Sequence, residues 1–246
     1  MKVKTYSDLS MFCEINNRKI PLVMVGTSPF VGSSQFQDAK KYRKKFLHNP
    51  DAMLEILETS YKNGAKGMHV IDAGEILNVA QIMKETHDDF IITGSTVPGP
   101  DPHILPLVNV GAELIFIHGN TSKNMGEELI NLVEEIADLD IIPGLALHNP
   151  FTTLNYALHN LPQVNTFLVP FNEKGLYMEN KEQLEALIDN NTKCNFIGMK
   201  TLAAGKLSPN KAFEYISSHN ISSVAVGITE REQATETITT ALKYLI

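Results

Sequence analysis

Cysteine, tryptophan and basic charge are all scarce in this chain of 246 residues. It has no tryptophan and two cysteines, Cys13 and Cys194, which are far apart and share no metal-site spacing. We therefore expect two reduced thiols in a cytoplasmic protein. Lysine and arginine number 21 against 28 aspartates and glutamates, which gives a net charge of -7. Because phosphate contacts need a basic excess, we expect no nucleic-acid partner.

Several sequence signals that would fix a function are also absent. No apolar run approaches the roughly 18 residues of a membrane span, and residues 1–8 lack the apolar centre of a signal peptide, so we expect no membrane partner. The chain has neither a Gly-Lys-Ser/Thr phosphate loop nor a Gly-x-Ser-x-Gly nucleophile turn. Asp72, His118 and His148 would ligate a metal only if the fold brought them together. We predict no metal.

What the chain does contain is eight short apolar runs, each followed by a helical pattern. Each run ends in small or polar residues, as a buried parallel strand does when it delivers a loop to a binding face. The expected strands span residues 20–26, 67–71, 90–93, 113–117, 142–147, 166–170, 195–200 and 223–227. Eight such units in a chain of this length predict an α/β fold, a single (β/α)8 TIM barrel that covers residues 1–246 as one domain.

The remaining segments are predicted from turn and capping residues. Helices are expected at 50–63, 75–85, 102–110, 125–137, 151–160, 181–189, 210–218 and 231–244. Residues 1–19 are a lead-in, with a hairpin that turns at Asn16-Asn17. Residues 27–49 form a long first loop that carries the basic segment Lys40–Lys45. That segment is either a solvated helix face or a lid that presents positive charge to an anionic ligand.

In such a barrel the catalytic groups gather at the carboxyl ends of the strands. We predict catalytic roles for Asp72, Lys200, His118 and His148, since a carboxylate, a lysine and two histidines on one ring can do acid–base work. Each also has a structural alternative: Asp72 as a helix cap or the ion-pair partner of Lys200, and the histidines as hydrogen-bonded wall residues. His69, inside a strand, is interpreted as structural. The predicted ligand- and phosphate-binding residues are Thr27, Ser28, Ser95, Asn120, Asn149, Asn172, Thr201, Ala204, Gly205, Gly227, Thr229 and Arg231.

Five stretches together resemble the aldo-keto reductase barrel. They are Val25-Gly-Thr-Ser-Pro-Phe30, Val70-Ile-Asp-Ala-Gly74, Phe116-Ile-His-Gly119, Gly198–Leu207 and Val226-Gly-Ile-Thr-Glu-Arg231. The resemblance covers most of the chain. It implies the barrel fold, places Asp72 and His118 at two of the family's four catalytic positions, and places the nicotinamide cofactor at the seventh and eighth strands.

The chain departs from that family at the other two catalytic positions. The family's tyrosine should follow the aspartate, but residues 75–79 contain none, and its lysine should end the third strand, where Ile92–Thr96 has none. The basic groups that hold a cofactor 2′-phosphate after strand eight are reduced to Arg231. The fold is therefore expected to carry over and hydride transfer is not, because a carbonyl oxygen lacks its usual proton donor.

Three functions remain open from the sequence. The favoured one is an enzyme that acts on a small anionic or carbonyl-containing metabolite. In the most specific version of this hypothesis, Lys200 is a nucleophile that forms a Schiff base with the substrate. The second is an NADPH-dependent oxidoreductase with a non-standard acid, although NADPH is not the favoured cofactor. The third is a barrel that binds a ligand or partner without catalysis. The sequence predicts neither the substrate nor the oligomeric state.

Overall fold

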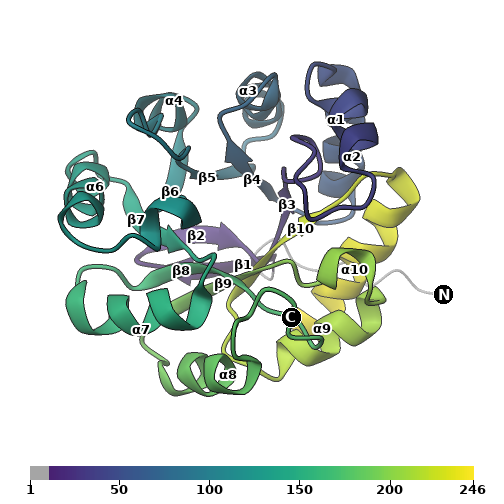
Figure 1. Cartoon of the computed structure of the whole chain (residues 1–246). Coiled ribbons are helices and arrows are strands. Elements are labelled where there is room, and N and C mark those ends of the chain that lie inside the picture. The colour runs from purple at the N-terminus through teal and green to yellow at the C-terminus, as the bar shows by residue number, and fades with distance from the viewer. Residues whose placement is uncertain (1–10) are drawn as a thin grey trace.

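A closed barrel of eight parallel strands forms the centre of the protein (Figure 1). The computed structural model describes residues 11–246. In chain order the barrel strands are β3 (Val23–Gly26), β4 (Gly67–Ile71), β5 (Ile91–Ser95), β6 (Ala112–Ile117), β7 (Ile142–Ala146), β8 (Thr166–Pro170), β9 (Asn195–Met199) and β10 (Ser223–Gly227). Neighbours in sequence are neighbours in the barrel, and β10 pairs with β3 to close it. The predicted (β/α)8 fold is confirmed.

Helices surround the barrel on its outer face (Figure 1). They are α1 (Ala39–Phe46), α2 (Pro50–Lys62), α3 (Ile76–Thr86), α4 (Ile104–Asn109), α5 (Gly119–Ser122), α6 (Glu127–Asp138), α7 (Pro150–Asn160), α8 (Lys181–Asn190), α9 (Pro209–Ser217) and α10 (Arg231–Leu245). The basic segment of the first loop is helical, because it forms α1. Across residues 11–246 no helix has both the length and the apolarity that a bilayer crossing requires.

Local signals explain where several helices begin. Asn49 caps α2 by accepting a hydrogen bond from the Ala52 N–H at 3.2 Å, and Pro50 occupies the first turn, where a missing N–H costs nothing. Asn180 caps α8 in the same way, accepting from the Gln183 N–H at 3.1 Å. These capping residues fix the helix starts independently of the barrel.

A two-stranded hairpin closes the bottom of the barrel. It consists of β1 (Phe12–Ile15) and β2 (Arg18–Pro21), joined at Asn16 and Asn17, which both have positive φ. The predicted turn is confirmed, but the predicted first strand over residues 20–26 was too long. Ile20 and Pro21 belong to the hairpin, and the barrel strand begins at Val23. Residues 1–10 of the predicted lead-in lie outside the described residues.

The apolar core has two layers, as both faces of a parallel sheet are buried. The outer layer packs the strands against the helices, and it includes Leu57, Val79 and Ile238. The inner layer fills the barrel with Met24, Leu114, Phe116, Ile142, Leu168 and Ile197, and the hairpin adds Ile15 and Ile20 from below. Because these side chains fill the lower barrel, a cavity can form at the carboxyl ends of the strands.

Candidate functional site

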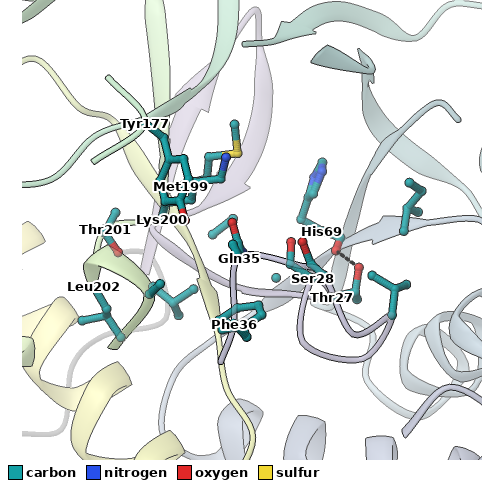
Figure 2. Close-up of a pocket in the computed structure, with 18 of the residues that line it drawn as sticks. Thr27, Ser28, Gln35, Phe36, His69, Tyr177, Met199, Lys200, Thr201 and Leu202 are labelled. Carbon is teal, nitrogen blue, oxygen red and sulfur yellow. Dashed lines mark hydrogen bonds between the residues drawn. The ribbon is translucent and has the colours of Figure 1, made fainter. Parts of the chain in front are cut away.

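A cavity of about 660 Å³ opens at the carboxyl ends of the strands. Its wall comes from strand ends, from the first loop and from the segments that follow β8 and β9 (Figure 2). Its nitrogen-bearing titratable groups are one lysine and three histidines, two tyrosines also line it, and no aspartate or glutamate does so among residues 11–246. Seven serine and threonine residues also line it: Thr27, Ser28, Ser33, Ser34, Ser95, Thr201 and Thr229. This chemistry favours an anionic, polar ligand.

Lys200 follows β9 directly and enters the cavity beside Tyr177 (Figure 2). Its Nζ lies 4.5 Å from the centre of the Tyr177 ring, and it forms no ion pair within residues 11–246. Burial lowers the pKa of the Lys200 amine, since the charged form loses water without gaining a carboxylate. The backbone of Lys200 has a φ of 56°, which a side-chain-bearing residue rarely adopts. Such strain is concentrated at functional sites.

His118 and His148, which follow β6 and β7, form a pair in the cavity wall. Their ring centres are 4.9 Å apart, and the rings meet edge to face. The Asn120 N–H donates to His118 Nδ1 at 3.2 Å, so the neutral His118 ring carries its proton on Nε2. His148 Nδ1 lies 3.2 Å from the carbonyl oxygen of the Asn120 side chain, so it donates and leaves a lone pair on Nε2. The pair thus offers one donor and one acceptor.

Both histidines stay neutral near pH 7. Burial is the main cause of the lowered pKa of His118, and the charges of Lys123 and Lys200 lower it further. Burial likewise lowers the pKa of His148, together with the charge of Lys200, to about 4. Since a neutral imidazole keeps distinct donor and acceptor nitrogens, the pair can polarise a carbonyl with one ring and move a proton with the other.

A strained loop with free polar groups follows Lys200. Ala203 and Ala204 have φ values of 50° and 55°, and Gly205 follows with 85°. The Thr201 side chain is 1% exposed, and its Oγ1 has no hydrogen-bond partner in the described structure. A buried hydroxyl without a partner is costly, so a rotation of the Thr201 side chain that brought Oγ1 to a bound oxyanion would gain a hydrogen bond.

His69 belongs to the deep wall of the cavity. Its Nδ1 and Nε2 lie 2.9 Å from Thr93 Oγ1 and from Ser95 Oγ, and its carbonyl accepts a hydrogen bond from Thr27 Oγ1 at 2.9 Å. Burial lowers its pKa to about 4. The structural interpretation of His69 was therefore incomplete, since the residue lines the site. The signal was present in the sequence: His69 and Ile71 are two apart on β4, so both face inward.

The structure gathers most of the predicted site residues around this cavity. The predicted residues that line it are Lys200, His118, His148, Thr27, Ser28, Ser95, Thr201, Ala204, Gly205, Gly227 and Thr229. Sequence reasoning did not anticipate the aromatic and amide side chains that complete the wall. These are Gln35, Phe36, Tyr42, Tyr177 and Gln233.

Five predicted residues lie outside the cavity wall, and each has another partner or is exposed. The Asp72 carboxylate accepts from His103 Nδ1 at 2.9 Å, so it forms no ion pair with Lys200. Asn172 is fully buried and bonds to both backbone groups of Leu176. The remaining three are Asn120, which orients the two histidines, the exposed Asn149, and Arg231, which pairs with Glu55 at 3.3 Å. Nowhere in residues 11–246 do three or more potential metal-ligating side chains converge.

Solved structures resemble this barrel closely in shape. No protein-family model matches the chain, and no curated protein matches its sequence. A putative aldo-keto reductase from Pseudomonas aeruginosa superposes with a TM-score of 0.68 at 13% identity, covering 93% of both chains. The chain has the aldo-keto reductase barrel fold. An aldo-keto reductase from Klebsiella pneumoniae in complex with NADPH gives 0.62 at 11% identity, covering 94% of this chain and 88% of that one.

An aldolase also has a barrel of similar shape. The 2-keto-3-deoxy-6-phosphogluconate aldolase of Zymomonas mobilis, solved with 3-phosphoglycerate, gives a TM-score of 0.57 at 15% identity. The match covers 80% of this chain and 88% of that one. Identities this low show a shared fold, so the chemistry has to be argued from the cavity itself.

Proposed function

We propose that this protein is an enzyme that binds a small anionic carbonyl compound and forms a Schiff base with it through Lys200. One observation carries the proposal: the Lys200 amine lies in the cavity wall with a lowered pKa and without a carboxylate partner among residues 11–246. An amine is a nucleophile only when it is uncharged, and burial next to apolar and aromatic groups is the usual way to reach that state near neutral pH.

The two histidines supply the other groups that the reaction needs. Nε2–H of His118 donates to the ligand's carbonyl oxygen while the uncharged Nζ of Lys200 attacks the carbonyl carbon. His148 Nε2 accepts a proton from the attacking nitrogen and returns it to that oxygen. Both amine protons leave with the oxygen as one water molecule, and a C=N bond joins Lys200 to the ligand. Proton transfer of this kind needs a base that is neutral at the working pH.

The segment after Lys200 provides the contacts for the anionic end of the ligand. Thr201 Oγ1 has no partner, and the N–H groups of Thr201 and Leu202 form no hydrogen bond within the described residues. Donors of this kind beside a lysine stabilise carboxylate or phosphate oxygens. The aldolase of similar fold was solved with a phosphorylated acid, which supports a ligand of this class.

Borohydride trapping tests the proposal. The protein is incubated with pyruvate, glyoxylate or glyceraldehyde 3-phosphate and then reduced, and the intact mass is measured. We expect one adduct, heavier by the compound less one oxygen atom, that peptide mapping places at Lys200. Lys200→Arg, which keeps a long basic side chain but has no nucleophilic amine, should give none, and exchanging the exposed Lys40 for Arg should leave the adduct unchanged. An unmodified protein with every carbonyl compound would refute the Schiff base.

A second candidate function is carbonyl reduction with a nicotinamide cofactor. Tyr177 favours it, because its ring lies beside the Lys200 amine and a tyrosine next to a lysine is a plausible proton donor. The start of α10 does not fit the cofactor, however. There the Glu230 carboxylate pairs with Lys45 at 3.0 Å, and Arg231 pairs with Glu55. The Thr229 N–H already donates to the Gln233 side chain. A fluorescence titration with NADPH and NADH decides: saturable micromolar binding would revive this candidate.

A further inference from the structure

His69 fixes the orientation of two hydroxyl groups in the deep cavity wall. Thr27 Oγ1 donates to the His69 carbonyl oxygen at 2.9 Å (Figure 2). The second hydroxyl, Ser95 Oγ, lies 2.9 Å from Nε2 of the His69 ring. Both hydroxyl-bearing residues are buried at the surface of the cavity, with 3% and 6% exposure. Which groups they can recognise depends on where their protons point.

The arrangement that satisfies most hydrogen-bonding groups around His69 places the ring proton on Nδ1. The Thr93 hydroxyl donates to the sulfur of Met24 at 3.5 Å, and a thioether can only accept. Thr93 Oγ1 therefore accepts the hydrogen bond from His69 Nδ1, which lies 2.9 Å away. Nε2 of the neutral ring is left with a lone pair, so the Ser95 hydroxyl donates to it. Thr93 is fully buried, so water does not redirect its proton.

The cavity is consequently divided into a donor side and an acceptor side. The hydroxyl groups of Thr27 and Ser95 each donate their one proton to His69, so they can only accept hydrogen bonds from the ligand. Lys200 and the Nε2–H of His118 offer protons. No carboxylate lines the cavity among the described residues, so the acceptor side is neutral and fits hydroxyl groups better than ammonium groups.

We infer that the ligand is a hydroxylated carbonyl compound, with one or two hydroxyl groups that donate to Thr27 and Ser95 while its carbonyl and anionic end face Lys200. The inference rests on the proposed function for the position of the carbonyl group, and it narrows the substrate class to polyhydroxy keto or aldehyde acids and their phosphates. A simple keto acid would leave the two oriented oxygens without partners, which costs binding free energy in a buried wall.

A matched pair of ligands tests this inference. The probes are 2-oxopentanoate and 4,5-dihydroxy-2-oxopentanoate, which share chain length and charge and differ in two hydroxyl groups. Calorimetry gives the two dissociation constants, and borohydride trapping on the same samples gives the adduct yields. The variants are Ser95→Ala and Thr27→Val, with Thr27→Ser as the variant that keeps the hydroxyl. Thr59→Val in α2, a residue outside the cavity wall, is the matched control.

Each satisfied hydroxyl should tighten binding by about 2- to 10-fold, so we expect the dihydroxy compound to bind roughly 4- to 100-fold more tightly than the plain keto acid. Ser95→Ala and Thr27→Val should each remove one such factor, whereas Thr27→Ser and Thr59→Val should keep the full ratio. Thermal denaturation confirms that each variant is folded. A ratio near one in the unaltered protein, or a ratio unchanged in both hydroxyl-deleting variants, would overturn the inference.

The two readouts separate this inference from the proposed function. Selective binding of the dihydroxy compound without any reduced adduct would remove the Schiff base and leave the hydroxyl recognition standing. Equal binding of both compounds, each with an adduct at Lys200, would do the reverse. Absence of binding by the dihydroxy compound would overturn the inference, whatever the adduct yield.

Discussion

Replacing Gly119 by alanine perturbs the histidine pair without touching either ring's chemistry. A Cβ at this position would lie 2.5 Å from Cγ and Cδ2 of His148 and 3.0 Å from its backbone nitrogen. Carbon atoms in contact prefer about 3.5–4.0 Å, so the His148 ring has to move by more than about 1 Å. Gly119 is not among the residues with positive φ, so alanine fits its backbone. The whole effect therefore falls on His148.

The magnitude follows from two opposing contributions. Inserting a methyl group into a packed contact costs about 1–3 kcal/mol, and alanine in place of glycine in a helix recovers about 1 kcal/mol. The free energy of unfolding should therefore fall by only about 0–2 kcal/mol. The pKa of His148 should change more clearly. Partial burial and the charge of Lys200 hold it at about 4, so a ring displaced from these surroundings should titrate closer to the ordinary 6.5.

An NMR titration of the histidine ring signals measures this shift. We expect the His148 signal of Gly119→Ala to titrate at higher pH than that of the unaltered protein, and Schiff-base formation to slow. Thr121→Ala, in the same short helix, is the control and should leave both unchanged. A His148 pKa that stays at about 4 in Gly119→Ala would show that the ring is not held between Gly119, Asn120 and His118 as described.

Two further predictions concern stability. A Cβ on Gly144 would lie 2.6 Å from the Phe116 ring and 3.0 Å from the Thr166 carbonyl oxygen, so Gly144→Ala should lower the free energy of urea unfolding by about 1–3 kcal/mol. Gly26→Ala, whose Cβ meets nothing closer than 3.6 Å, should cost less, and equal losses would contradict the packing. His69 has a pKa of about 4 in the folded chain against 6.5 unfolded, so its contribution is complete above pH 6.5. It decreases as the pH falls toward 4, by about 1.4 kcal/mol per unit and up to about 3 kcal/mol. His69→Gln should flatten this part of the stability–pH curve, and an unchanged slope would mean that His69 protonates freely in the fold.

The barrel could be predicted from the sequence because its signal is repeated. Each buried strand is a short apolar run, and eight runs with intervening helical patterns leave few alternative folds. The first strand shows where the method fails. Residues 20–25 form one apolar run, yet Ile20 closes the barrel from below and Val23 begins its wall. Only tertiary contacts distinguish the two parts, because both are buried.

The sequence predicts which residues lie at the strand ends, but it does not predict which of their side chains point into the cavity. Successive residues of a strand point to opposite faces. His69 and Ile71 line the cavity, so the next residue, Asp72, points away from it. Applying that alternation to β4 would have removed Asp72 from the catalytic set. Tyr177 was not predictable in this way. It lies in the segment after β8 with a φ of 65°, and no local pattern indicates that its ring reaches Lys200.

Competitive labelling of the Lys200 amine tests the account most directly, because it needs no substrate. A trace of an amine-reactive reagent is applied across a pH series to the folded and the denatured protein, and mass spectrometry reads the labelling at Lys200. In the folded protein we expect half-maximal reactivity at a lower pH than in the denatured chain, where an ordinary value of 10.5 applies. An equal or higher midpoint in the folded protein would contradict the account, because Lys200 would then stay charged at neutral pH and form no Schiff base.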